Sequence, residues 1–432
     1  MLEVLENLYI RYYKDSIVLK RFTKVFTLDV LVRASNFILL PVYLKLMSKE
    51  EFGLYTYLYS FLSLFSLIMN FGLYLAVSKL YHDYKEHERK SLVFTINILL
   101  LFLLMVVLLP IYLTGADYYF IRVLLTHPFN YDIYRNYLFF SLIIAVLSFM
   151  MTNFFIASEN IKYLQIFNFL KLVLVHGVVI YLLYTINDNS IKIRFQYAYL
   201  IEGLIILLFM FFYVKNMAVD FKIEYAKKAL KIGLPSMFIF IFGLVYNLSD
   251  KFILEKYGTY SDMAIYNLGF TLASIISVVF NSFQSVYLPF FFKEKDLIKS
   301  FSRTKNILAK MSILFSLLSI LIYIGIYFAI MLNLIDKEKY SEVLFILPIL
   351  LASQIVQSAV LLFSNYVVYF EIVYVGTVII AILSAVNLGL NLLLIPKYNY
   401  VGAAVSTLII TSLSLLFYYS YIKIKYINKI KM

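Results

Sequence analysis

The chain has 432 residues, of which 63% are hydrophobic and 15% are charged, and its sequence contains no cysteine. This composition is far from that of soluble globular domains and is typical of a protein that crosses a membrane many times. The lack of cysteine excludes disulfides, a thiolate nucleophile and thiolate-bound zinc or iron–sulfur centres. A formal net charge of +13 would suggest a nucleic-acid partner for a soluble protein, but its placement here indicates membrane topology, so no nucleic acid is expected.

Residues 1–25 are predicted to form an interfacial segment on the cytoplasmic side. Charged residues interrupt this segment before an apolar core can build, so it does not resemble a signal peptide. Leu2, Leu5, Leu8 and Tyr12 keep helical spacing, which favours a short helix lying on the membrane surface.

Apolar stretches of about 20 residues then recur to the end of the chain, each long enough to cross a hydrocarbon core of roughly 30 Å as a helix. The fold class is therefore predicted to be all-α, with about twelve transmembrane helices. The predicted spans are 26–46, 52–78, 91–113, 136–158, 163–186, 195–214, 232–254, 263–288, 305–332, 343–368, 372–395 and 398–421.

Basic residues gather in alternate connections, as expected where those connections are cytoplasmic. They cluster in the N-terminal segment, in the second, sixth and eighth connections, and in the tail. Both termini are therefore predicted to be cytoplasmic. This divides the chain into an N-terminal six-helix bundle (26–214), a cytoplasmic linker (215–231), a C-terminal six-helix bundle (232–421) and a basic cytoplasmic tail (422–432).

The two bundles are predicted to be copies of one another. A shift of 211 positions superposes residues 36–70 on 247–281, with six identities: Asn36 and Asn247, Lys45 and Lys256, Tyr55 and Tyr266, Ser63 and Ser274, Ser66 and Ser277, Asn70 and Asn281. Since each copy has an even number of helices, the repeats are parallel. Two such bundles around a central cavity suit transport by alternating access.

The sequence predicts neither an enzyme nor a cofactor. No predicted connection exceeds roughly two dozen residues, short of the ~40 residues that an independent domain needs. No Gly-rich phosphate loop followed by Lys and Ser or Thr occurs, so an ion gradient or the substrate's own gradient must drive transport. His82 and His87 lie among charged residues of a solvated turn, and no metal site is expected.

Ionisable residues at membrane depth cost roughly 2.5 to 3.5 kcal/mol each, so the few in this chain are candidate functional residues. Asp29 and Arg33 lie one turn apart on the first predicted span. They form either an internal ion pair or a site in which Arg33 faces a cavity and binds phosphate. Lys171 lies at a comparable depth on the fifth span and would complete this pyrophosphate site, unless it snorkels alone. Lys45, beyond the expected kink at Pro41, is the third candidate cation.

Four residues are candidates for coupling transport to an ion such as a proton or sodium: Asp29, His176, Glu202 and Asp250. Glu202 is the best placed of the intramembrane acids, and His176 would titrate in a useful range. Each has a plainer interpretation. His176 could be a hydrogen-bonded neutral imidazole, Glu202 a paired interface residue, and Asp250 part of an ordinary charged helix end near the external surface.

Several motifs resemble the oligosaccharide flippases of bacterial surface-polysaccharide assembly, the polysaccharide transporters related to exporters of the MATE type. They are Glu51 to Tyr55 (EFGLY), Gly233 to Pro235 (GLP), Asp250 to Leu254 (DKFIL), Asn391 to Pro396 (NLLLIP) and Gly402 to Thr407 (GAAVST). The helix count and the pattern of connections extend this resemblance over the whole chain.

The resemblance implies a MATE-like fold in the bacterial inner (cytoplasmic) membrane. It implies a substrate made of an oligosaccharide linked through pyrophosphate to a polyprenol such as undecaprenol, carried from the cytoplasmic to the outer leaflet. Membrane lipids and a polysaccharide polymerase would be its partners. The alternatives are a multidrug or organic-cation antiporter of the same fold, which should favour buried acids, and a polymerase or glycosyltransferase, which would need a larger external loop than 114–135.

Overall fold

The computed structural model describes residues 35, 37–186, 189–294, 296–370 and 372–427. The interfacial segment expected at 1–25 and residues 26–34 and 36 of the first predicted span therefore lie outside the described residues. The same holds for Asp29 and Arg33, two of the candidate site residues.

Every regular element in the described part of the chain is a helix. Before the middle of the chain these are α3 (Leu40–Leu46), α4 (Lys49–Ile68), α5 (Leu73–Leu80), α6 (Glu86–Thr114), α7 (Ala116–Leu124), α8 (Tyr131–Ala157), α9 (Ile161–Leu170), the π-helical turn η1 (Lys171–Val175), α10 (His176–Thr185) and α11 (Ser190–Val214). The long helix α12 (Ile223–Tyr257) follows. The remainder are α13 (Tyr260–Ala273), α14 (Ile275–Lys293), α15 (Leu297–Met331), α16 (Lys337–Tyr340), α17 (Val343–Tyr369), α18 (Val373–Ile422) and η2 (Lys423–Ile427).

The described residues contain nine helices long and apolar enough to cross a membrane, or ten if α4 and α5, bent by 50° at their break, count as one span. Helix α18 contains two of the predicted spans. Its 50 residues would be about 75 Å long if unbroken, more than twice the hydrocarbon core. The break falls at Asn399, three residues after Pro396, where φ is 52°. The all-α membrane fold is therefore confirmed.

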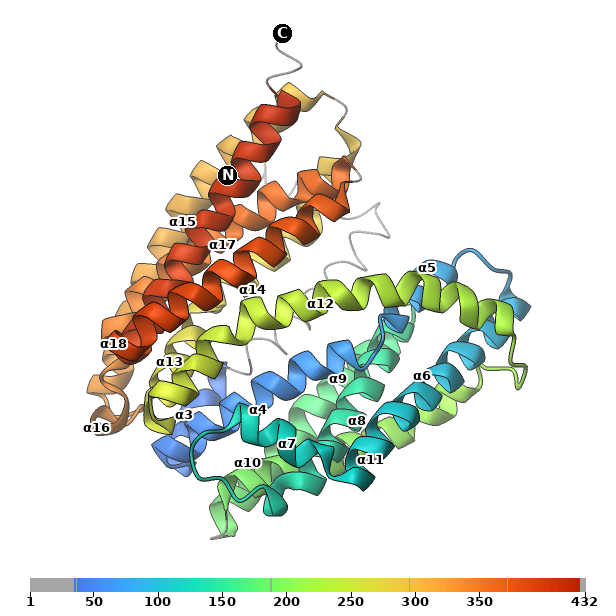
Figure 1. The fold of residues 1–432 in the computed structure, drawn as a ribbon, viewed down its shortest axis with the longest axis horizontal. Helices are drawn as coiled ribbons and strands as arrows, with labels where there is room; N and C mark the ends of the chain where they lie inside the picture. Colours follow the sequence, from blue (N-terminus) through green and yellow to red (C-terminus); the bar gives the residue numbers. More distant parts are fainter. Residues whose placement is uncertain (1–34, 36, 187–188, 295, 371, 428–432) are drawn as a thin grey trace, which may run out of the picture.

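The helices form two groups that diverge from a common end (Figure 1). Helices α3 to α11 make one group and α13 to α18 the other, with α4 against α13 as the main contact between them. Helix α12 packs against α18 of the second group and also contacts α4, α5 and α6 of the first. In Figure 1 it runs from α13 at the shared end to α5 at the far tip of the first group. We call the shared end, near α3, α13 and α16, the junction.

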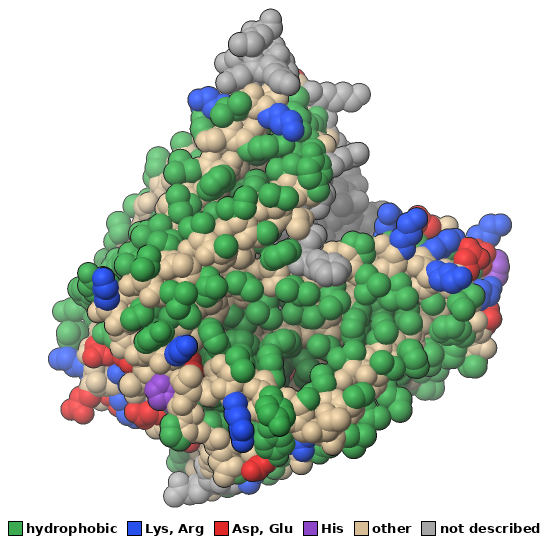
Figure 2. Space-filling view, in the orientation of Figure 1, with side chains coloured by type: hydrophobic (Ala, Val, Ile, Leu, Met, Phe, Trp, Pro, Cys, Tyr) green, Lys and Arg blue, Asp and Glu red, His purple; other side chains and the backbone are tan. Residues whose placement is uncertain are grey.

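Charged side chains gather at the tips of the molecule, and hydrophobic side chains cover the surface between them (Figure 2). Large apolar side chains in the middle of the outer helices are widely exposed, such as Leu207 on α11 (67%) and Leu321 on α15 (66%). Apolar surfaces of this extent suit contact with lipid, which explains why the charged side chains on the outer surface in Figure 2 gather at the tips.

Two helices at the junction begin in the same way. The Ser48 side chain caps α4 and Glu51 bonds back to it, while Thr259 and Asp262 form the same capping box on α13. The two boxes are separated by the 211 positions of the proposed repeat. Between them, Glu50 also meets its own counterpart, because Glu50 Oε1 accepts a 2.7 Å hydrogen bond from Ser261 Oγ.

Two glycines of the motifs lie where the helix backbones approach most closely. A Cβ atom on Gly53 would lie 1.9 Å from the carbonyl oxygen of Tyr260 on α13. A Cβ atom on Gly233 of α12 would lie 2.4 Å from the carbonyl oxygen of Phe71, in the break between α4 and α5. Only glycine fits either place without a backbone shift.

Candidate functional site

A cavity of about 420 Å³ opens inside the first group of helices, between α4, α8, η1 and α11. Its lining is rich in hydroxyl groups and aromatic rings and includes three charged side chains. The lining residues are Tyr55, Tyr59, Leu62, Ser63, Ser66, Leu67, Ser141, Ile144, Ala145, Ser148, Phe149, Thr152, Lys171, Arg194, Phe195, Ala198, Tyr199 and Glu202. We call it the N-terminal cavity.

Lys171 and Glu202, predicted separately as a phosphate ligand and as a coupling acid, form an ion pair in this cavity. Lys171 Nζ also donates a 2.8 Å hydrogen bond to Ser148 Oγ on α8. The two charged side chains are 31% and 20% exposed, so water and solutes in the cavity can reach both. The positive charge of Lys171 is thus shared with a carboxylate rather than free.

The π-helical turn η1 begins at Lys171. A π-turn adds a residue to the helical repeat and so rotates the side chains that follow it, and such turns are frequent at functional sites. Lys171 faces the cavity, whereas His176, directly after the turn, bonds to Tyr43 Oη through Nδ1 at 2.8 Å. His176 is therefore a hydrogen-bonded residue between α3 and α10.

Arg194 is the cation of the cavity that the sequence analysis missed. Its guanidinium carbon lies 3.5 Å from the ring centroid of Tyr55 and 4.0 Å from that of Tyr43. Among the described residues its guanidinium has no carboxylate at ion-pair distance, and Nη1 contacts only Met47 Sδ at 3.5 Å. The predicted span began one residue later, so Arg194 was left outside the membrane. Arg194, Ala198 and Glu202 are spaced four residues apart and so share one face of a helix, and this spacing could have placed Arg194 beside Glu202.

Asp250 is buried rather than part of an exposed helix end, with 7% of its surface accessible. It accepts hydrogen bonds from the Tyr266 hydroxyl and, at 2.8 Å, from the backbone N–H of Lys251. Helix α12 continues to Tyr257, past the predicted end of this span at residue 254. Lys251 Nζ reaches the first group of helices and donates to Ser60 Oγ at 2.6 Å.

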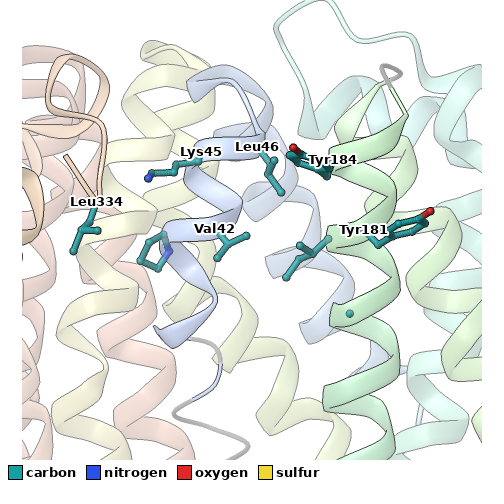
Figure 3. Close-up of a pocket in the computed structure, with 9 residues that line it drawn as sticks. Val42, Lys45, Leu46, Tyr181, Tyr184 and Leu334 are labelled. Carbon is teal, nitrogen blue, oxygen red and sulfur yellow. The ribbon is translucent and has the colours of Figure 1, made fainter. Parts of the chain in front are cut away.

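Lys45 lies apart from the other candidate cations. It lines a separate, largely apolar groove between α3 and α10, with Pro41, Val42, Leu46, Gly177, Ile180, Tyr181, Tyr184 and Leu334. In Figure 3 the Lys45 side chain extends from α3 toward Leu334, whereas Tyr184 points toward Leu46. The structure therefore brings Lys171 together with Glu202 and Arg194, but not with Lys45.

In the second group of helices, the interior along α17 is polar but uncharged, unlike the N-terminal cavity of the first group. Helix α17 carries amides and hydroxyls but no charged residue. Gln354 accepts a hydrogen bond from the Ser277 hydroxyl, and Gln284 Nε2 donates to Asn365 Oδ1 at 3.2 Å. The two groups are thus chemically unequal, with the charges of the N-terminal cavity on one side only.

Comparisons with known proteins agree with this arrangement. Residues 18–295 match the family model described as polysaccharide biosynthesis protein. The fold is similar to an inward-facing multidrug resistance MATE family transporter (TM-score 0.62, 13% identity, 93% of this chain and 94% of that chain). It is also similar to a MATE transporter of Vibrio cholerae (TM-score 0.61, 16% identity, 94% and 97%).

The lipid II flippase MurJ in an inward closed conformation is a further structural match (TM-score 0.64, 16% identity, 91% of this chain and 87% of that chain). No curated protein matches the sequence at a significant level. The resemblance drawn from the motifs is confirmed by the family model and the fold. Because the matched segment covers well over half of its length, the chain belongs to the polysaccharide biosynthesis protein family.

Proposed function

We propose that this protein is a flippase that carries an undecaprenyl-pyrophosphate-linked oligosaccharide from the cytoplasmic to the outer leaflet of the bacterial inner membrane. The product would serve O-antigen, capsule or exopolysaccharide assembly, in concert with a polysaccharide polymerase. The observation that carries this proposal is the N-terminal cavity, which combines two cations with hydroxyl groups and tyrosine rings.

The pyrophosphate and the sugars of the substrate each have matching groups in the cavity. The Arg194 guanidinium, stacked on two tyrosine rings, keeps its fork of donors for a phosphate, and Lys171 adds a second positive charge. Tyr55, Tyr59 and Tyr199 present faces for sugar rings, and five Ser and Thr hydroxyls offer hydrogen bonds. Arg33 remains a proposed third ligand from the segment outside the described residues.

Glu202 is the coupling acid that we propose, with a proton as the ion. An incoming phosphate competes with Glu202 for Lys171, and a carboxylate that loses its cation at membrane depth is stabilised by protonation. Asp250 and His176 are already held by neighbouring tyrosines, which makes them weaker candidates. Asp29 lies in the segment outside the described residues.

We further propose that both termini are cytoplasmic and that the two groups of helices are parallel repeats, with the bounds given by the sequence. The basic connection between α5 and α6 and the C-terminal end of α18, which leads into η2, lie at the diverging ends of the molecule (Figure 1). Under this topology the diverging ends lie on the cytoplasmic side, so the structure is in an inward-facing state and the junction lies on the external side. The paired capping boxes, and the contact of Glu50 with its counterpart Ser261, support the repeat.

A multidrug or organic-cation antiporter is less well supported. Such a protein should offer uncompensated acids to its substrate, yet the lining of the N-terminal cavity holds two cations and a single carboxylate, which is already paired. The MATE structures share the fold at low identity and so do not decide the substrate.

A strain from which this gene is deleted tests the proposal. We expect loss of surface polysaccharide and accumulation of its lipid-linked precursor, both reversed by the wild-type chain and by Lys45→Ala. Arg194→Gln should reach normal protein levels without restoring the polysaccharide. Full restoration by Arg194→Gln would reject the phosphate site, and normal polysaccharide in the deletion strain would reject the function.

A further inference from the structure

A second cluster of polar groups, outside the N-terminal cavity, joins the two groups of helices at the junction. Glu255 on α12 has only 1% of its surface accessible, which is unusual for a carboxylate. A buried carboxylate is costly unless donors surround it. Within the described part of the chain, the donors to Glu255 come from Thr126 and His127, in the connection between α7 and α8 of the other group.

The donors surround both oxygens of the carboxylate. The backbone N–H of Thr126 lies 2.8 Å from Oε1 and 3.0 Å from Oε2, and its hydroxyl donates to Oε2 at 2.9 Å. The backbone N–H of His127 donates to Oε1 at 3.1 Å, and its ring Nδ1 lies 3.2 Å from the same oxygen. This is a built site for one carboxylate rather than a chance surface contact.

The connection that receives Glu255 is itself fixed to the first group. Tyr57 Oη on α4 donates a 2.6 Å hydrogen bond to the carbonyl oxygen of Leu124, at the end of α7. One turn earlier on α12, Lys251 makes the contact with Ser60 of α4. Lys251 and Glu255 therefore share a face of α12 that binds the first group through charge-assisted hydrogen bonds.

We propose that Glu255 is the external latch of this transporter, which holds the junction closed while the molecule faces inward and releases Thr126 and His127 when it faces outward. The inference rests on the alternating access proposed above. In the outward-facing state, water replaces the donors of Glu255, so the carboxylate is satisfied in both states and the latch can open without leaving a buried unpaired charge.

The ion pair at the rim of the junction is exposed, unlike the buried carboxylate of Glu255. Lys49 Nζ and Glu342 Oε2 are 3.2 Å apart, but the Glu342 side chain is 53% exposed. Exposed pairs of this kind contribute little. Glu342→Gln is therefore a matched control, since it removes the same charge from the same end of the molecule.

The test uses the absence of cysteine from the sequence. A single Ala198→Cys reporter in the N-terminal cavity is labelled from outside with a membrane-impermeant maleimide. We expect slow labelling in the otherwise wild-type chain and in Glu342→Gln. In Glu255→Gln we expect labelling to be faster by about tenfold or more, because the amide nitrogen of glutamine donates hydrogen bonds and cannot accept those of Thr126 and His127. Labelling of Glu255→Gln at the wild-type rate would overturn the latch.

A second measurement guards against misfolding of the variant. The pair Glu50→Cys and Ser261→Cys, joined by a short bifunctional thiol reagent, should crosslink efficiently in the wild-type background and clearly less in Glu255→Gln. Unchanged crosslinking would contradict the latch, as would loss of the folded, monodisperse protein. If both readouts behave as expected while no lipid-linked glycan is transported, the latch stands and the proposed substrate is wrong.

Discussion

Arg194 is the residue whose environment is most specific to anion binding. Its guanidinium is sandwiched by Tyr43 and Tyr55, an arrangement that orients the planar group and suits arginine better than lysine. Whatever enters the N-terminal cavity therefore meets a positioned cation whose donors are not taken by a carboxylate among the described residues.

The first prediction concerns this stacking. Arg194→Lys keeps the charge but loses the fork and the ring contacts, so transport should fall about tenfold, and Arg194→Gln should reduce it further. Initial rates at equal amounts of protein in the membrane are the measurement. Wild-type rates in Arg194→Lys would show that charge alone matters at this position.

The second prediction separates the structural from the functional role of the Lys171 and Glu202 pair. Lys171→Met alone leaves an unpaired carboxylate, which should cost about 1–3 kcal/mol of stability. The double variant Lys171→Met with Glu202→Gln should recover that stability without recovering transport. Thermal unfolding in detergent and transport rates are measured on the same samples. Recovered transport in the double variant would show that the pair has only a structural role.

At this scale the sequence located the charged residues inside the helical part of the chain, but it did not predict which residues they contact. Depth along a predicted span singled out Lys171, Glu202 and Asp250, and all three lie in polar clusters within the structure. The partners of Lys171 and Glu202 depend on how α8 to α11 pack together and on the π-turn at Lys171, and the partner of Asp250 depends on how α12 packs against α13. The length of an apolar run encodes none of these. Arg194 was missed because the predicted span began at residue 195, whereas α11 begins at Ser190.

At the scale of helices, the sequence predicted the long helices but not the breaks between them. The runs of apolar residues predicted the long helices well, because membrane thickness determines their length. They did not predict the bend between α4 and α5, where Phe71 and Gly72 have φ of 51° and 67°. Such breaks depend on tertiary contacts such as the one between Gly233 and Phe71.

The third prediction concerns the paired capping boxes. Ser48→Ala and Thr259→Ala each remove the side-chain acceptor of a helix N-terminus and should cost about 1 kcal/mol each. Ser78→Ala, which removes only an intrahelical bond to the Tyr74 carbonyl, is the control and should be nearly neutral. Thermal unfolding measures all three. A large loss at only one of the two caps would argue that the repeated starts of α4 and α13 are not equivalent.

The fourth prediction concerns the close approach of α4 and α13. Gly53→Ala places a Cβ atom against the Tyr260 carbonyl, so it should push the junction apart and raise external labelling of the Ala198→Cys reporter severalfold. Gly325→Ala is the control, because no atom lies within 4 Å of its added Cβ, and a gain of up to about 1 kcal/mol from helix propensity is expected there. Equal labelling of the two variants would show that the contact does not control closure.

At the scale of the molecule, the two groups of helices carry different chemistry. The first group holds the charged N-terminal cavity, and the second offers amides and hydroxyls. The division fits a transporter in which one side captures an anionic headgroup while the other slides past uncharged sugars. Helix α12 contacts both groups, so it is placed to couple the state of the cavity to the junction.

The decisive measurement is leaflet access of a labelled undecaprenyl-pyrophosphate oligosaccharide in proteoliposomes that contain the wild-type chain, Lys45→Ala or Arg194→Gln. We expect translocation by the wild-type chain and Lys45→Ala, and a rate at least about tenfold lower for Arg194→Gln. Equal translocation by Arg194→Gln, or transport of an organic cation in place of the lipid-linked glycan by the wild-type chain, would contradict the proposed flippase.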